Sequence, residues 1–247
     1  MGSLVRITER NPIRRIVKKH CLWQPNEDGD NGLMVDLDEP QNRVRQEWLH
    51  STLKEVPDNS FLKAHLPYSE EMESFLLSLG FKILFIVRDP RDVAVSHCNH
   101  IMKDIRHPLY HYFSELPDYS ARIRALLNGH VSSQSHVLSP LQQRLYHALG
   151  WWRSERTLSV RFEDLIGPKG GGSEAIQKQI VLSICEHLEV PSATINLDHL
   201  LKNIFYRNAR TFHKGAIGTW RDIFDQETLC FFEKKLAESS EQYGYAM

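Results

Sequence analysis

The stretch that most constrains the fold is Phe81–His100, FKILFIVRDPRDVAVSHCNH, where an apolar run ends abruptly at charged residues. Its apolar part, Ile83–Val87, is rich in β-branched residues and too short for a helix, which predicts a buried parallel strand. Pro90 suits the first turn of a helix, and Asp89 is placed to be the N-cap of that helix. The sequence therefore predicts a strand, a tight turn and a helix in direct succession.

This turn is a candidate anion site. Backbone N–H groups and cationic side chains gather at the carboxyl end of such a strand, where open α/β sheets bind anionic ligands. Arg88 offers a forked charge for a phosphate, and Ser96 offers a hydroxyl one or two helical turns along. The pattern fits equally well a capped turn with surface arginines, because most strand–helix turns bind nothing. From the spacing alone, both interpretations stay open.

Length and charge narrow the class of protein. The chain of 247 residues is long enough for one large α/β domain, and we expect a single domain over residues 1–247. Lys and Arg number 30 against 31 Asp and Glu, so no bulk attraction to nucleic acid or to a membrane is implied. We expect no signal peptide, and no apolar run approaches the ~20 residues that span a bilayer. These features favour a cytoplasmic protein.

Cysteine and histidine spacing argues against a disulfide framework or a metal site. The four cysteines are far apart and form no CxxC pair, which is typical of free thiols in a reducing compartment. The thirteen histidines form no HExxH motif. We therefore expect no bound metal.

Apolar periodicity predicts further strands and helices. Short strands are expected at Ser60–Leu66 and Thr157–Phe162, in addition to Ile83–Val87. Three strands that alternate with helices imply a parallel sheet covered on both faces, which is an α/β fold. We expect His107–Ser139 to be a long irregular stretch with one helix, forming a substrate-side insertion or lid. Helices are predicted at Leu4–His20, Glu39–Lys54, Ser69–Leu79, Tyr119–Asn128, Pro140–Arg153, Ser173–Leu188, Asn196–Ile204 and Gln226–Tyr243.

A second candidate site is Lys63–Pro67, KAHLP, at the end of the first expected strand. In a strand, Lys63 and His65 share one face, and Pro67 stops the strand just beyond them. His65 is then expected at the ligand edge of the sheet, where a neutral imidazole can take a proton from a hydroxyl group. The plainer alternative, favoured for this motif alone, is a histidine that bonds a loop carbonyl.

A third candidate is Phe212–Trp220, FHKGAIGTW. Its two glycines let the backbone approach a ligand closely, and Lys214 with His213 can meet a phosphate. An ordinary surface loop is the alternative. The run Gly167–Gly172, GPKGGG, lacks the spacing of a phosphate-binding loop, so we expect a flexible connection there.

Taken in chain order, these motifs resemble those of the PAPS-dependent sulfotransferases of the cytosolic type. KAHLP is similar to the family's KxHLP strand end, and Ile86–His100 is similar to its 3′-phosphate-binding strand, turn and helix. LYHALGWW at Leu145–Trp152 and VRFEDL at Val160–Leu165 are similar to the family's WW-containing helix and YEDL-type strand. Phe212–Trp220 is similar to the loop that closes over the nucleotide. The resemblance implies a parallel β-sheet flanked by helices, in a P-loop-like sulfotransferase fold.

The resemblance also implies roles. The co-substrate would be PAPS (3′-phosphoadenosine 5′-phosphosulfate), without a metal, and the acceptor a hydroxyl or amine of a small molecule or peptide. His65 would be the catalytic base, and Lys63 would assist electrostatically. A homodimer is left open, and neither nucleic acid nor a membrane is expected as a partner. The residues implied in nucleotide binding are Arg88, Ser96, Phe162, Phe212, His213, Lys214 and Gly215.

The sequence departs from the family in three places. The family's PKSGTxW-type loop, which cradles the 5′-phosphosulfate and supplies a lysine, has no match, and Met1–Arg10 resembles at best the helix after it. His213 replaces an arginine, which makes one phosphate contact pH-dependent. Phe162 replaces a tyrosine whose hydroxyl can bond the adenine, which weakens nucleotide binding modestly.

These departures lead to two expectations. The first strand and its loop are expected to be missing through N-terminal truncation, which leaves sheet edges exposed near Leu62 and Ile86 and lowers stability. The chain is then expected to have little or no sulfotransferase activity, although its parent gene product transfers sulfate. The alternative is a non-catalytic remnant that binds adenosine 3′,5′-bisphosphate (PAP) or a protein. A kinase-like phosphoryl transferase is disfavoured because no Walker loop is present.

Overall fold

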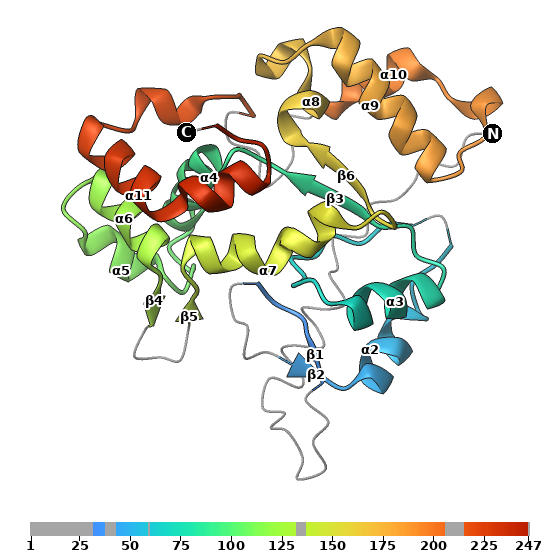
Figure 1. Ribbon diagram of the computed structural model, residues 1–247, viewed down its shortest axis with the longest axis horizontal. Helices are drawn as coiled ribbons and strands as arrows, with labels where there is room; N and C mark the ends of the chain where they lie inside the picture. Colours follow the sequence, from blue (N-terminus) through green and yellow to red (C-terminus); the bar gives the residue numbers. More distant parts are fainter. Residues whose placement is uncertain (1–31, 38–42, 59, 132–136, 206–214, 247) are drawn as a thin grey trace. The chain divides into compact units, whose positions relative to one another are not determined.

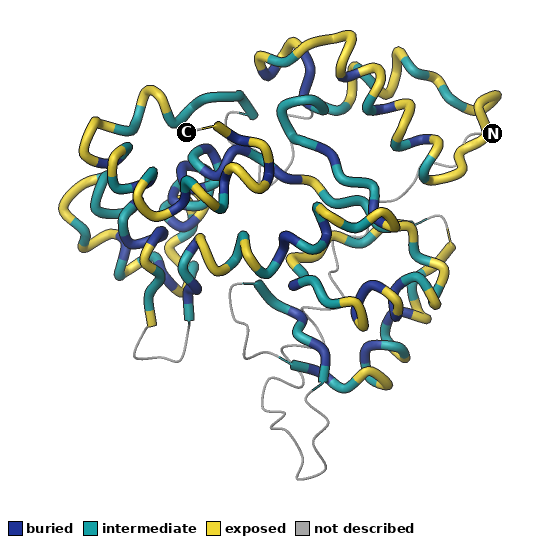
Figure 2. The backbone as a smooth tube through the Cα atoms, in the orientation of Figure 1, coloured by how far each residue is buried: buried dark blue, intermediate teal, exposed yellow. Residues whose placement is uncertain are grey.

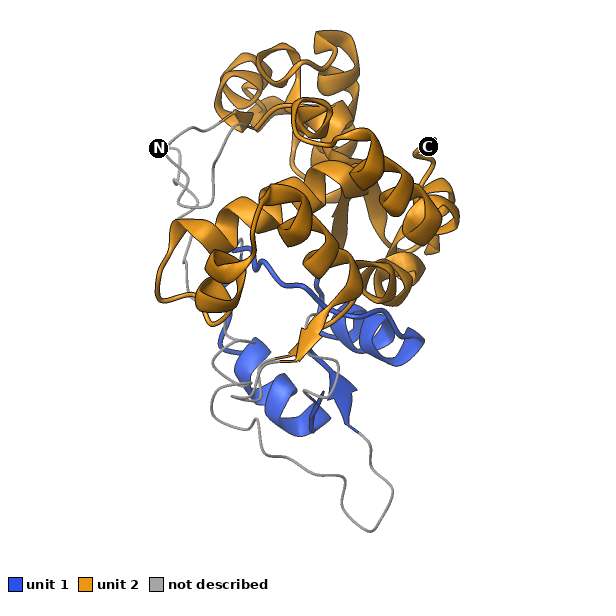
Figure 3. Cartoon of the chain, turned by 90° about the vertical axis from the view of Figure 1, so that its left-hand side faces the viewer, with its two compact units in different colours: residues 1–81 blue, residues 82–247 orange. Residues whose placement is uncertain are grey.

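The computed structural model describes residues 32–37, 43–58, 60–131, 137–205 and 215–246 (Figure 1). The chain divides into two compact units, residues 1–81 and residues 82–247, and each is described by itself (Figure 3). The single domain expected over 1–247 therefore stays a prediction. The expected helix at Leu4–His20 and the expected binding residues Phe212, His213 and Lys214 lie outside the described residues.

In its described residues, the first unit contains a small hairpin and two helices. Strand β1 (Leu33–Met34) pairs antiparallel with β2 (Arg43–Val44). Helix α2 (Gln46–Leu53) follows, so the helix predicted from Glu39 begins later than expected because β2 precedes it. Helix α3 (Glu70–Ser78) lies within the helix predicted at Ser69–Leu79, and Ser69 caps it by accepting the Met72 N–H at 3.0 Å.

The strand predicted at Ser60–Leu66 is not formed, and this prediction is wrong. The segment has no regular secondary structure. Its backbone accepts one hydrogen bond at the His65 carbonyl, from the Leu37 N–H at 3.0 Å. A run of extended residues becomes a strand only when a neighbouring strand completes the ladder, and apolar periodicity does not show whether that neighbour exists.

The second unit contains the parallel pair that the sequence predicted. Strand β3 (Leu84–Val87) lies parallel to β6 (Leu158–Arg161), with Leu84 opposite Leu158 and Val87 opposite Arg161. Among the described residues this parallel sheet has two strands, not the three expected. Helix α7 (Leu141–Arg153) packs against both strands, and α9 (Glu174–His187) packs against β6.

Strand β3 is not buried throughout. Val87 is 5% exposed, whereas Ile86 is 48% exposed. The prediction of a fully buried strand is therefore wrong at Ile86.

The main core of the second unit lies among α4 (Pro90–Lys103), α6 (Tyr119–Asn128) and α11 (Gln226–Gln242), where the tube in Figure 2 is coloured as buried. The predicted bounds of α6 match the structure, and those of α7, α9 and α11 agree within one or two residues. The remaining elements of this unit are α5 (Tyr110–Glu115), β4 (His130–Val131), β5 (Val137–Leu138), α8 (Phe162–Ile166), η1 (Pro168–Gly170), η2 (Ser192–Thr194), α10 (Leu197–Ile204) and η3 (Thr219–Asp222).

The stretch His107–Ser139 is more regular than expected. It holds two helices, α5 and α6, and an antiparallel pair of short strands, β4 and β5. Phe113 and Ile123, one from each helix, are fully buried, so these helices belong to the core. In the described part of the chain, no helix has the length and apolar character needed to cross a bilayer.

Candidate functional site

The turn after β3 is built as its sequence predicted. The Asp89 side chain accepts the Arg91 N–H at 2.9 Å and so caps α4, and Pro90 occupies the first turn of this helix. The Asp89 backbone N–H donates to Glu163 Oε1 at 2.9 Å. The first turn of the helix is therefore tied to the start of α8, which follows β6.

Arg88 is held at this turn by three contacts. Its side chain is 18% exposed, and its Nη2 donates to the Ala216 carbonyl at 2.7 Å. The same nitrogen lies 3.6 Å from Asp92 Oδ2, and the guanidinium carbon lies 4.5 Å from the centre of the Phe162 ring. The guanidinium is thus packed on an aromatic face, which supports a cation–π interaction.

The Nε–H group of Arg88 is a donor that these contacts leave without an acceptor. The Nε atom is buried and has no hydrogen-bond partner in the part of the chain that the structure describes. A buried, charged donor without an acceptor is costly, so a site of this kind is suited to an anion that supplies the acceptor. The arrangement favours the anion-binding interpretation of the turn over the surface-arginine alternative.

Asp92 fastens the loop Gly215–Trp220 to the same turn. Its carboxylate is fully buried; Oδ2 accepts the Gly218 N–H at 2.7 Å, and Oδ1 accepts the Thr219 hydroxyl at 2.7 Å and the Trp220 N–H at 3.1 Å. The Arg91 guanidinium lies over the Trp220 ring at 4.3 Å. Sequence reasoning missed Asp92, because its hydrogen bonds to residues 218–220 are long-range.

The glycine-rich run Gly167–Gly172 is more ordered than the flexible connection that its sequence predicted. Its first residue accepts the N–H groups of Gly170 (3.0 Å) and Gly172 (2.8 Å), which closes a tight turn around η1. The Gly170 carbonyl then accepts the Ile217 N–H at 2.9 Å. The run therefore packs against the loop Gly215–Trp220.

Two residues near the carboxyl end, Tyr245 and Ala246, also contact the turn after β3, the first of them through Glu163. The Tyr245 hydroxyl donates to Glu163 Oε2 at 2.7 Å, and the Arg91 guanidinium donates to the Ala246 carbonyl at 3.1 Å. Burial raises the pKa of Tyr245, and its hydrogen bond to the Glu163 carboxylate raises it further. The phenol therefore stays protonated and keeps Glu163 in place for the Asp89 N–H. Neither Glu163 nor Tyr245 was singled out from the sequence, because their contacts are long-range.

The other predicted site residues are placed as follows. Ser96 lies half-buried on α4, and Gly215 has a left-handed backbone with φ of 58°. Both belong to the second unit, with Arg88. Lys63 and His65 belong to the first unit, and both are exposed.

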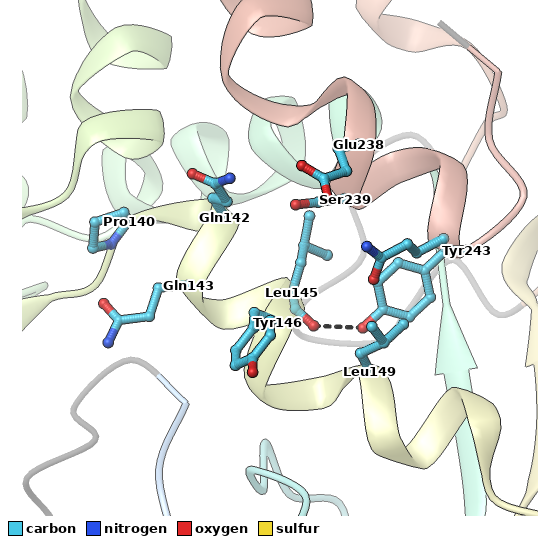
Figure 4. Close-up of a pocket in the computed structure, with 10 residues that line it drawn as sticks. Pro140, Gln142, Gln143, Leu145, Tyr146, Leu149, Glu238, Ser239 and Tyr243 are labelled. Atoms are coloured by element: carbon cyan, nitrogen blue, oxygen red, sulfur yellow. Dashed lines mark hydrogen bonds between the residues drawn. The ribbon is translucent and has the colours of Figure 1, made fainter.

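A cavity of about 390 Å³ lies elsewhere in the second unit, between α7 and α11 (Figure 4). At its wall the Tyr243 hydroxyl donates to the Leu145 carbonyl at 2.6 Å. None of the predicted site residues lines this cavity, so it is separate from the Arg88 turn. Its lining is Pro140, Gln142, Gln143, Leu145, Tyr146, Leu149, Glu238, Ser239, Gln242 and Tyr243. Within the described residues, no three His, Cys, Asp or Glu side chains are grouped so as to hold a metal ion.

Comparison with known proteins identifies the family of this chain. The family model of the sulfotransferase domain matches residues 47–244. The chain belongs to this family. Among curated proteins, this chain is similar to Sulfotransferase 1A1 of Rattus norvegicus, 26% identical over 189 residues, and of Mus musculus, 24% identical over 200 residues. Each match covers 70% of this chain and 60% of the relative. The chain thus spans less than two thirds of the length of these relatives.

Two solved structures share the fold of this chain. Mouse sulfotransferase SULT7A1 complexed with PAP has a TM-score of 0.59 at 16% identity, covering 82% of this chain and 73% of that one. Retinol dehydratase in complex with androsterone and inactive cofactor PAP has a TM-score of 0.53 at 17% identity, covering 96% and 78%. The expected α/β sulfotransferase fold is confirmed.

Proposed function

We propose that this chain binds PAPS and its product PAP at the Arg88 turn, and that it serves sulfuryl transfer to a hydroxyl or amine acceptor. The observation that carries the proposal is the half-buried Arg88 side chain, which packs on Phe162 and bonds Ala216, while its buried Nε has no partner among the described residues. Family membership and the PAP present in both structural relatives support the choice of anion.

The 3′-phosphate is the group we assign to this turn. Arg88 supplies a forked charge, and Ser96 and Gly215 belong to the same unit. The Phe162 ring packs against the guanidinium, with its centre 4.5 Å from the guanidinium carbon. The remaining proposed ligands, Phe212, His213 and Lys214, follow from the sequence motif alone.

His65 is our proposed base, and Lys63 our proposed electrostatic assistant. As the acceptor oxygen or nitrogen forms a bond to sulfur, the bond from sulfur to the bridging oxygen of PAP breaks in line. The acceptor proton goes to the His65 imidazole. Androsterone, bound in one structural relative, carries a hydroxyl and supports a small-molecule acceptor of that kind.

We propose further that transfer by this chain is slow. The negative charge that grows on the bridging oxygen needs preorganised donors, each worth ~3–4 kcal/mol. The sequence has no PKSGTxW-type loop to supply them. The alternative function, a non-catalytic protein that binds PAP or a protein partner, rests on the same absence. The free thiols of Cys98, Cys185 and Cys230 support a cytoplasmic location as a further proposal.

Calorimetric titration with PAP tests the function. Arg88→Ala should weaken PAP binding by about 10–100-fold, because it removes a charge-assisted contact to phosphate. Arg106→Ala is the matched control, since Arg106 is exposed and paired with Asp104, and it should leave the affinity unchanged. Equal affinities for Arg88→Ala and the unmodified chain would contradict the proposed site.

Sulfuryl transfer separates the two candidate functions. Radiolabelled PAPS is incubated with a panel of phenols, alcohols and amines, and transfer is followed over many hours to catch a slow rate. Transfer above the buffer background supports the enzyme. PAP binding without any transfer supports the non-catalytic alternative.

A further inference from the structure

We propose that the glycine-rich run Gly167–Gly172 positions Arg88, and that it acts through the single peptide group between Ala216 and Ile217. The inference rests on the proposed function, because it concerns the residue assigned to the 3′-phosphate. The carbonyl of this peptide accepts from Arg88 Nη2 at 2.7 Å. Its N–H donates to the Gly170 carbonyl at 2.9 Å. One rigid group is therefore held from both sides.

The rigidity of that group is what couples the two contacts. A peptide unit is planar, so its C=O and N–H cannot turn independently of one another. The Gly170 carbonyl fixes the direction of the N–H and thereby the direction of the carbonyl that meets Arg88. Hydrogen bonds in such a chain also polarise one another, so the Ala216 carbonyl becomes a better acceptor for the guanidinium.

The absence of a side chain at Gly170 is part of the arrangement. A Cβ at this position would lie 2.7 Å from the Gly215 carbonyl oxygen and 2.5 Å from Ile166 Cγ1. Both distances are well below van der Waals contact, and the Gly215 oxygen is backbone that cannot rotate away. A larger residue would push Gly215 and the adjoining peptide out of place.

The run itself is anchored to the body of the second unit. The Gly167 carbonyl accepts from both Gly170 and Gly172, and Gly167 has φ of 68°, which favours glycine. The buried Gln177 side chain packs against Gly167, where a Cβ would come within 2.5 Å of it, and its Nε2 donates to the Leu165 carbonyl at 3.0 Å. Gly170 therefore presents its carbonyl from a fixed position.

The test is a double-mutant cycle read by PAP affinity. Gly170→Ala should weaken PAP binding roughly tenfold, because it displaces the peptide that holds Arg88. Arg88→Lys keeps the charge but loses the fork, and in that background Gly170→Ala should change the affinity less than about threefold. Equal effects in the two backgrounds would show that Gly170 acts independently of Arg88, and the inference would be wrong.

Gly129→Ala is the matched control for a steric clash. A Cβ on Gly129 would lie 2.6 Å from the Leu138 carbonyl oxygen, close to the 2.7 Å at Gly170, but on a different loop. It should lower the thermal midpoint at least as much as Gly170→Ala does, and leave PAP affinity unchanged. A similar loss of affinity in both variants would reduce the Gly170 effect to general destabilisation and overturn the inference.

Hydrogen exchange on the unmodified chain gives a reading that does not depend on any variant folding. The Ile217 amide should be protected in the free chain and become more protected when PAP is saturating, because PAP binding then tightens the Arg88 contact. An unprotected Ile217 amide under saturating PAP would exclude the role of Gly170. Failure of the function is distinct: there, Arg88→Ala itself leaves PAP affinity unchanged.

Discussion

The turn Arg88–Asp92 and the segment Lys63–Pro67 carry the two halves of the proposed chemistry, and they differ in how they are held. Asp92 is fully buried and accepts three hydrogen bonds from the loop after residue 217, and the Arg88 side chain is 18% exposed. In contrast, Lys63 and His65 are exposed, and the hydrogen bond to the His65 carbonyl is a backbone contact that does not involve the imidazole.

This difference separates binding from catalysis. A group that is already held by its neighbours binds a ligand with little further loss of conformational freedom, so the Arg88 turn meets this condition for the anion that we propose. A base contributes only when it is held within hydrogen-bond reach of the proton that it takes. We therefore expect nucleotide affinity to depend on the turn, and sulfuryl transfer to depend on residues that the turn does not influence.

The largest expected effect is on transfer. His65→Ala should lower the rate of sulfuryl transfer by about 10²–10⁴-fold, because the proton of the acceptor loses its base. Its PAP affinity should stay within about twofold of that of the unmodified chain. Single-turnover assays with radiolabelled PAPS measure the first quantity, and calorimetry measures the second. A parallel loss of both would show that the two regions are not separable.

The next effect is on stability. Asp92→Ala should lower the free energy of unfolding by about 3 kcal/mol, because three loop donors and the Arg88 guanidinium lose their buried acceptor. Lys63→Ala, in the exposed segment, should change it by less than about 0.5 kcal/mol. Urea denaturation followed by tryptophan fluorescence compares the two variants. If Asp92→Ala and Lys63→Ala had similar free energies of unfolding, the buried contacts of Asp92 would not stabilise the fold more than the exposed Lys63 does.

The next prediction concerns the free energy of unfolding at alkaline pH. It depends on Cys98, a fully buried residue of α4. Burial raises the pKa of its thiol from 9.0 to about 11. Between these values the folded state binds more protons than the unfolded state, so stability falls as the pH rises from 9 to 11, by about 1 kcal/mol per pH unit. Urea denaturation at pH 8, 9 and 10 measures the total slope, to which Tyr119, Tyr243 and Tyr245 also contribute because burial raises their pKa values.

Cys98→Ala is the variant that isolates this contribution. It should make the pH dependence shallower by about that amount, although it also removes a buried atom and lowers the stability at every pH. Alkylation with iodoacetamide gives an independent check at pH 8: the buried Cys98 should react far more slowly than the exposed Cys230. An unchanged slope together with equal alkylation rates would contradict the packed state of the helix.

The elements that could be predicted from the sequence are those with a local signal. A β-branched run, an Asp cap and a proline at the first helical position specify the unit around Arg88, and the structure agrees. The strand predicted at Ser60–Leu66 failed because a strand depends on a partner elsewhere in the chain. The contacts from Arg88 to Ala216 and from Asp92 to Gly218 join residues 128 and 126 positions apart, and no local pattern reports such pairs.

The smallest expected effect concerns the ring beneath Arg88. Phe162→Leu keeps a similar apolar volume but removes the aromatic face that lies 4.5 Å from the guanidinium carbon, so PAP affinity should fall about 3–5-fold. Phe61→Leu makes the same change at a 44% exposed phenylalanine of the first unit, and it should leave the PAP affinity unchanged. Calorimetric titration of both variants against PAP measures the difference. If Phe162→Leu binds as tightly as Phe61→Leu, then the ring only fills space, and the polar contacts of Arg88 with Ala216 and Asp92 are sufficient to hold the anion-binding turn.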